Sequence, residues 1–109
     1  MNSEKLKRII SKLDHYLNIG IAIINLDNFN IEYENELFPN WIEHSKNSNN
    51  LSERVSNLRT DRVLKRCSKG RSYEHEIELS KGGRNKSLKI QIAPILEDES
   101  NLAIVKVVD

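Results

Sequence analysis

Two short segments near opposite ends of the chain are apolar at almost every position. Residues 21–24 read Ile-Ala-Ile-Ile, and residues 102–108 are apolar except at Lys106. Runs rich in β-branched residues are typical of strands that are covered on both faces. The chain is therefore expected to fold around a sheet in which both segments lie in the interior.

Three other segments alternate between apolar and polar residues, as half-buried strands do. They are residues 31–34, 72–79 and 88–92. Pro94 follows near the end of the last strand, where the absence of a backbone N–H disturbs strand pairing least. Turn residues separate the strands at 25–30, at 80–86 around Gly82-Gly83, and at 97–101. Because these connections are of hairpin length, we expect antiparallel pairing.

Helical spacing predicts four helical segments. An amphipathic helix from Ser3 carries Leu6, Ile10, Leu13 and Leu17 on one face, which fits an ordinary packed helix and a short coiled-coil seam equally well. A short helix around 37–42 tolerates Pro39 near its start, and residues 51–58 hold one turn. A longer helix spans 59–69, with Thr60 or Asp61 as its cap and Gly70 at its end. Helices beside an antiparallel sheet indicate an α+β domain.

Length, charge and cysteine content exclude several classes of protein. The 109 residues fit one domain, and 17 basic residues balance 16 acidic ones to a net charge of +1. Nucleic acid and anionic membranes are therefore not expected as partners. Cys67 is the only cysteine, which excludes an internal disulfide and agrees with a reducing, cytoplasmic location. The first residues lack a signal-peptide core, and the longest apolar run is too short to span a membrane.

The order and spacing of these elements resemble the PAS (Per-Arnt-Sim) sensor domain family. The resemblance lies in residues 13–27 (LDHYLNIGIAIINLD), in 31–38 with Asn35 (IEYENELF), in 70–77 (GRSYEHEI) and in 104–109 (IVKVVD). It implies a five-stranded antiparallel sheet with short helices on one face, the first and last strands being central. The expected organisation is an amphipathic signalling helix over 1–18 and a PAS domain over 19–109.

The resemblance implies a non-enzymatic module that senses a signal, dimerises and regulates an output domain of kinase or cyclase type. Asp109 matches the residue that opens the hinge to such an output domain, so we expect a piece of a longer, bacterial signalling protein. A homodimer is expected through the outer sheet face and the helix residues Leu6, Ile10, Leu13 and Leu17. Two alternatives stay open: a ligand-free PAS domain used only for dimerisation and relay, and an unrelated small α+β adaptor.

No cofactor is predicted for the pocket that the family encloses. The cysteine motif of flavin-binding members is absent, and residues 59–69 contain no histidine to ligate haem iron. A small-molecule ligand remains possible, and the candidate pocket residues are Tyr33, Trp41, Leu64, Cys67 and His75. Each has a plainer alternative: Cys67 as a buried apolar residue, His75 as a packed, hydrogen-bonded one, and Trp41 as part of the core.

Other polar patterns predict neither a catalytic nor a metal site. Glu74, Glu76 and Glu78 share one strand face, which is typical of a solvated surface. The three histidines lie far apart without partners at ligand spacing, and no Ser-His-Asp order or phosphate loop is present. Arg59 and Arg62 are either exposed helix charges or groups that neutralise an anionic ligand.

Overall fold

The computed structural model describes residues 4–5, 7–8, 19–42, 49–55, 57–81, 83–95 and 101–108. Its elements in chain order are β1 (Gly20–Asn25), β2 (Ile31–Glu34), α2 (Phe38–Trp41), α3 (Leu51–Arg54), α4 (Thr60–Cys67), β3 (Tyr73–Lys81), β4 (Arg84–Pro94) and β5 (Leu102–Val108). Residues 4–5 and 7–8 are helical, and the rest of the predicted N-terminal helix lies outside the described residues.

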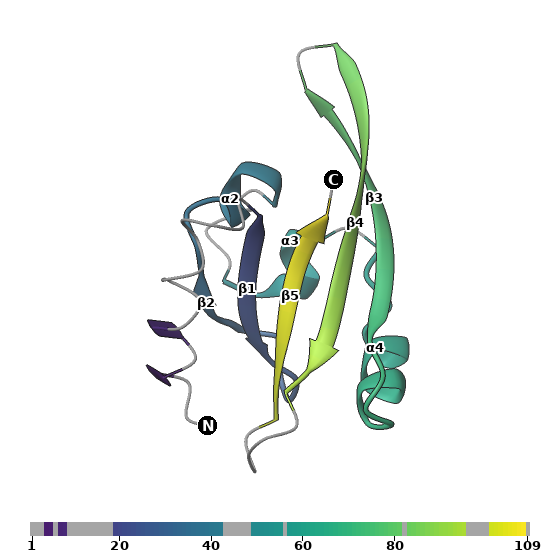
Figure 1. Ribbon diagram of the computed structural model, residues 1–109. Helices are drawn as coiled ribbons and strands as arrows, with labels where there is room; N and C mark the ends of the chain where they lie inside the picture. Colours follow the sequence, from purple (N-terminus) through teal and green to yellow (C-terminus); the bar gives the residue numbers. More distant parts are fainter. Residues whose placement is uncertain are drawn as a thin grey trace.

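The five strands form one antiparallel sheet in the order β2-β1-β5-β4-β3 (Figure 1). The last strand is central and the first lies beside it, as predicted from their doubly apolar sequences. Ile23 pairs with Ile104 at the middle of the β1–β5 contact. The predicted α+β fold class is confirmed.

The helices α2, α3 and α4 lie on one face of the sheet and enclose the main core with it (Figure 1). Phe38, Leu51 and Val63, one from each helix, are fully buried. They pack with the inward residues of the strands, among them Ala22, Ile24, Leu88, Ile90, Ile92, Val105 and Val107. Burial of this apolar surface is the main force that holds the helices on the sheet.

The opposite, outer face of the sheet has two unlike halves. Over β2, β1 and β5 it carries a second apolar cluster, which we call the apolar half: Ile21, Ile23, Tyr33, Leu102 and Ile104, with Ile19 and Ile95. Over β4 and β3 it is polar, with Glu74 beside Gln91 and Glu76 beside Lys89 in the strand register. Side chains of one strand alternate between faces, so every second residue of each strand reaches this outer face. These residues are mostly apolar in β1 and β5 and mostly polar in β3 and β4.

Strand β2 departs from the predicted alternation. Ile31 and Tyr33 were expected to share a buried face, but Ile31 joins the main core and Tyr33 the apolar half. The register of β1 with β2 shifts between Ile23 and Ile24, so that Ile24 opposes Ile31 while Ala22 opposes Glu34. A bulge of this kind adds one residue and reverses the facing of the residues beyond it. Glu34 consequently points towards the helices.

The hairpin of β3 and β4 is longer than predicted. The turn was expected at Gly82-Gly83 inside the polar run 80–86, and strand pairing extends through that run to Lys81 opposite Arg84, with Gly83 at a positive φ of 78°. Only Lys89–Pro94 of β4 also pair with β5, so the hairpin projects beyond the sheet (Figure 1). Polar composition suggested a loop because a two-stranded projection has no core face to mark it.

The helix boundaries are close to the predicted ones. Pro39 lies in the first turn of α2. Gly70 follows α4 with a φ of 72°, a left-handed conformation that suits glycine, and its N–H donates to the Cys67 carbonyl at 3.0 Å. The prediction that Thr60 or Asp61 caps α4 is wrong, because Arg59 occupies the cap position and makes no side-chain cap bond.

Candidate functional site

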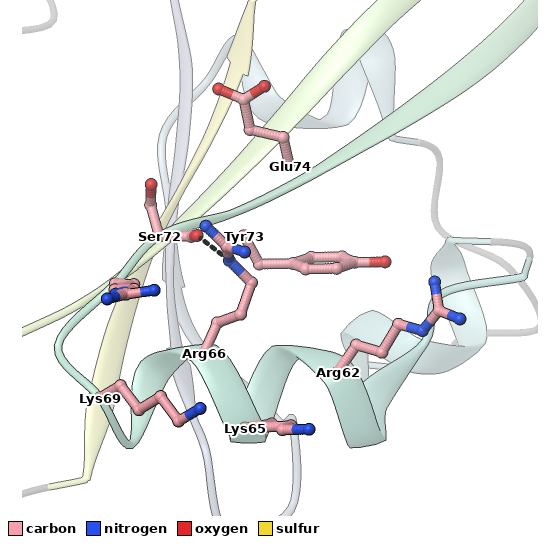
Figure 2. A pocket seen from close by; sticks show the side chains of 8 residues that line it. Arg62, Lys65, Arg66, Lys69, Ser72, Tyr73 and Glu74 are labelled. Atoms are coloured by element: carbon pink, nitrogen blue, oxygen red, sulfur yellow. Dashed lines mark hydrogen bonds between the residues drawn. The ribbon is translucent and has the colours of Figure 1, made fainter.

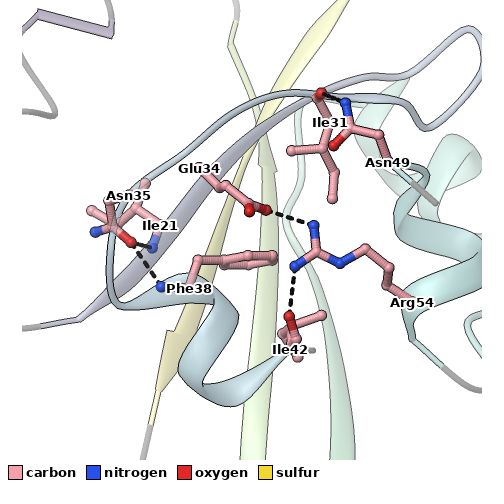
Figure 3. A network of polar contacts seen from close by, with 8 residues as sticks. All are labelled: Ile21, Ile31, Glu34, Asn35, Phe38, Ile42, Asn49 and Arg54. Carbon is pink, nitrogen blue, oxygen red and sulfur yellow. Dashed lines mark hydrogen bonds and ion pairs between the residues drawn. The ribbon is translucent and has the colours of Figure 1, made fainter. Parts of the chain in front are cut away.

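Asn35 ties the start of α2 to the start of β1 (Figure 3). Its side chain is 4% exposed, and its Oδ1 accepts from the backbone N–H of Ile21 and of Phe38, both at 3.0 Å. Its Nδ2 donates to the Ile19 carbonyl at 2.8 Å. One amide thus bonds three backbone groups, two of them buried, and fixes where the helical layer begins.

A buried arginine lies inside the domain between β2, α2 and α3. The Arg54 side chain is fully buried, and one terminal nitrogen donates to Glu34 Oε2 at 2.5 Å while the other donates to the Ile42 carbonyl at 2.6 Å (Figure 3). Its Cζ lies 5.4 Å from the Phe38 ring centroid. A buried charge is tolerated only when it is paired and hydrogen-bonded in this way.

The predicted pocket residues whose side chains the structure describes lie on different sides of the sheet. Cys67 is buried there, and burial raises the pKa of its thiol, which keeps it neutral. His75 opposes Ile90 and is half-buried on the same inner face. Tyr33 lies on the opposite face of the sheet, and Leu64 is 42% exposed. Trp41 ends α2, and its side chain lies outside the described part of the structure.

A groove rich in positive charge lies outside the core, between α4 and the start of β3 (Figure 2). We call it the basic groove. It has a volume of about 580 Å³ and is lined by Arg62, Lys65, Arg66, Lys69, Arg71, Ser72, Tyr73 and Glu74. Five of these eight residues are cationic and one is acidic. The chain's net charge of +1 conceals this concentration, because most of the 16 acidic residues lie elsewhere in the sequence.

Glu74 at the rim of the groove is already engaged. Its carboxylate accepts from Gln91 Nε2 at 3.0 Å and lies 3.4 Å from Lys89 Nζ. The Gln91 hydrogen bond and the Lys89 ammonium, with a smaller contribution from Arg66, hold the pKa of Glu74 below its usual value. This carboxylate therefore does little to neutralise the cations of α4.

The predicted dimer residues Leu6, Ile10, Leu13 and Leu17 and the predicted hinge residue Asp109 all lie outside the described residues. In the described ranges no three His, Cys, Asp or Glu side chains gather as metal ligands would. No helix in those same ranges is long and apolar enough to cross a membrane.

Comparison with known proteins rests on the fold, because no protein-family model and no curated protein matches the sequence. An RNA-binding light-oxygen-voltage receptor superimposes with a TM-score of 0.63 at 12% identity; the match covers the whole of this chain and 34% of that one. The PAS domain of nitrogen regulation protein NR(II) from Vibrio parahaemolyticus gives 0.61 at 15% identity, over 91% and 95% of the two chains. A PAS domain from a two-component sensor histidine kinase gives 0.59 at 18% identity, over 97% of both.

The chain has the PAS fold. The resemblance drawn from the sequence is confirmed at the level of fold, which does not by itself decide function. Within this PAS fold, the sequence analysis missed the two most distinctive polar features. Arg54 was not noticed because its partner Glu34 stands 20 residues earlier on a strand whose facing the bulge reverses. Of the basic groove, the sequence analysis singled out only Arg62, as a group that could neutralise an anionic ligand. The other cations were missed because charge was considered over the whole chain, although residues 62–71 contain five basic and no acidic side chains.

Proposed function

We propose that this PAS domain is a cytoplasmic signalling module that dimerises and relays a signal to an output domain of kinase or cyclase type joined through Asp109. In this proposal the domain itself catalyses no reaction. The observation that carries it is the apolar half of the outer face, which lies away from the main core and is partly exposed at Tyr33, Ile95 and Ile104. An apolar area on the face away from a domain's own core is a typical interaction surface.

The charge pattern supports the choice of that half as the dimer contact. Protein interfaces are depleted of charge at their centre, and the apolar half carries isoleucine, leucine and tyrosine, whereas the β3–β4 half carries glutamate and lysine. The N-terminal helix supplies the second part of the proposed interface through Leu6, Ile10, Leu13 and Leu17. A shift of this helix against the sheet would carry the signal between neighbouring domains.

The packed interior favours relay through protein contacts over an enclosed ligand. The helix residues that face the sheet are fully buried apolar side chains, and the Arg54–Glu34 pair lies beside them with its hydrogen bonds made within the chain. A ligand in this region would have to displace well-packed groups. A ligand-sensing PAS domain remains the second candidate, with Cys67 and His75 as the predicted pocket residues that face the interior.

The test is native mass spectrometry together with light scattering of the purified chain. We expect a dimer of bare chains. The variant Leu13→Glu/Leu17→Glu is expected to weaken dimerisation at least about tenfold, because it places charges in an apolar contact. The control Ser87→Glu/Gln91→Glu adds the same charge on the polar half of the outer face and should leave the dimer unchanged.

The outcomes separate the candidates. A monomer at the highest concentration, or a dimer unaffected by the helix variant, would contradict the proposed interface. A dimer that retains an additional small-molecule mass would favour the ligand-sensing candidate instead.

A further inference from the structure

The cations of the basic groove share one surface because two segments converge there. Arg62, Lys65 and Arg66 follow one another at helical spacing along the exposed side of α4, and Lys69 lies on the turn just after this helix (Figure 2). Arg71 follows in the stretch that leads into β3. The Tyr73 ring reaches from β3 over the helix towards Arg62, between the arginines. The result is a cationic surface with an aromatic ring in its middle.

These charges are not neutralised within the described part of the chain. Arg62, Lys65, Lys69 and Arg71 have no carboxylate at ion-pair distance there. Asp61, on the same helix, is 3.8 Å from Arg59 instead. On α4, Arg62 lies three residues from Lys65 and four residues from Arg66, and like-charged pairs at this spacing destabilise a helix. Favourable interaction with the helix dipole explains basic residues in the last turn but not Arg62 at the start.

Two groups in the groove are already held in position for a ligand. Arg66 Nε donates to the Ser72 carbonyl at 2.7 Å, which orients the guanidinium and leaves its terminal nitrogens without a hydrogen bond to any described residue. Tyr73 is half-buried and packs against the main core, so its ring is fixed. Groups that are ordered before binding lose less entropy on binding.

We propose that the basic groove binds a compact polyphosphate anion, such as the phosphate chain of a nucleotide or an inorganic polyphosphate. Guanidinium groups bind phosphate oxygens in pairs, and lysines add positive charge around them. The groove volume of about 580 Å³ lies in the range of small-molecule sites. Several cations and one engaged carboxylate favour an anion that carries several charges. Binding here needs no space in the packed interior.

The acidic row on β3 favours a compact anion over a nucleic acid strand. Glu74, Glu76 and Glu78 are exposed and continue along β3 from the edge of the groove. A long polyanion that left the groove along this strand would meet their charges, and like charges repel at short range. A ligand confined to the groove avoids them.

The test measures binding of tripolyphosphate and of ATP, both without metal, to the full chain by isothermal titration calorimetry at low salt. We expect both to bind, and Arg62→Gln/Lys65→Gln to weaken both by about tenfold, because two charge-assisted contacts are lost. The control Arg8→Gln/Lys86→Gln also removes one arginine and one lysine charge, outside the groove, and should change affinity less than about twofold. Thermal unfolding of each variant verifies that it is folded.

The two ligands distinguish the sources of the phosphate. Tighter binding of ATP than of tripolyphosphate, lost in Tyr73→Leu, would support a nucleotide whose base stacks on the ring. Equal binding would support an inorganic chain held by the cations alone.

Three results would overturn the proposal. The first is no binding of either anion at millimolar concentration, and the second is equal weakening by the groove and control variants, which would indicate non-specific charge. The third is far tighter binding of a twelve-nucleotide single-stranded RNA, which would make the groove a nucleic-acid site. Since the groove lies away from the apolar half, each result is independent of whether the chain dimerises.

Discussion

Arg54 and the arginines of the basic groove carry the same guanidinium group in opposite surroundings. The Arg54 side chain is fully buried and has a carboxylate, a carbonyl and an aromatic ring around it. Arg62 is exposed on α4 and has no such partner among the described side chains. The Arg54 charge is paired within the domain and stabilises the fold. The Arg62 charge is exposed, and in our proposal it binds an anion. Positive charge in this domain therefore divides into a structural and an interactive part.

Replacement of Arg54 should give the largest effect. Arg54→Met removes the partner of Glu34 inside the domain and is expected to lower the free energy of unfolding by about 3 kcal/mol, measured by urea denaturation. The matched control is Arg59→Met, whose 3.8 Å pair with Asp61 is solvent-exposed and should cost less than about 1 kcal/mol. Equal losses in the two variants would remove the distinction between structural and surface arginines.

Replacement of Asn35 tests whether a second buried polar side chain also contributes to the free energy of unfolding. Asn35→Ala leaves the N–H groups of Ile21 and Phe38 without their acceptor and should cost about 2 kcal/mol in the same assay. Asn28→Ala is the control, because its hydrogen bond to the Asn30 N–H is exposed, and a loss below about 1 kcal/mol is expected. A tolerated Asn35 variant would mean that α2 is positioned by packing alone.

Replacing cations of the basic groove should raise the free energy of unfolding, whereas replacing Arg54 or Asn35 should lower it. Arg62→Gln/Lys65→Gln relieves the like-charge pairs that Arg62 makes with Lys65 and Arg66 on α4, and it is expected to raise the free energy of unfolding by about 0.5 kcal/mol at low salt. The gain should vanish at high salt, near about 1 M, because screening removes the repulsion. A loss of stability at both salt concentrations would show that these side chains support the fold.

Glu74 should show the smallest effect, through its titration. Because its pKa is lowered in the folded state, its ionised form contributes stability above the unfolded pKa, and this contribution is lost as the pH falls through the folded pKa. NMR titration should place its midpoint below the ordinary pKa of a glutamate side chain. Gln91→Leu removes the first cause of the shift and should raise the midpoint; an unchanged midpoint would assign the shift to Lys89.

The sequence by itself determined the architecture of the sheet. The doubly apolar runs at 21–24 and 102–108 required cover on both faces, and these strands lie in the interior of the sheet. Gly70 and Pro39 marked helix limits through backbone geometry, which is a local property. Such features are predictable because burial and backbone preference act over a few neighbouring residues.

Only the tertiary structure decided which polar groups meet. The bulge at Ile23/Ile24 turned Glu34 inward to Arg54, and the register placed Asn35 against two separate elements. The turn after α4 brought Tyr73 and Arg71 beside the helix cations to form the basic groove. Contacts between residues tens of positions apart depend on the register of the strands. A shift of one residue in that register moves each side chain to the opposite face of the sheet, and local sequence patterns do not encode it.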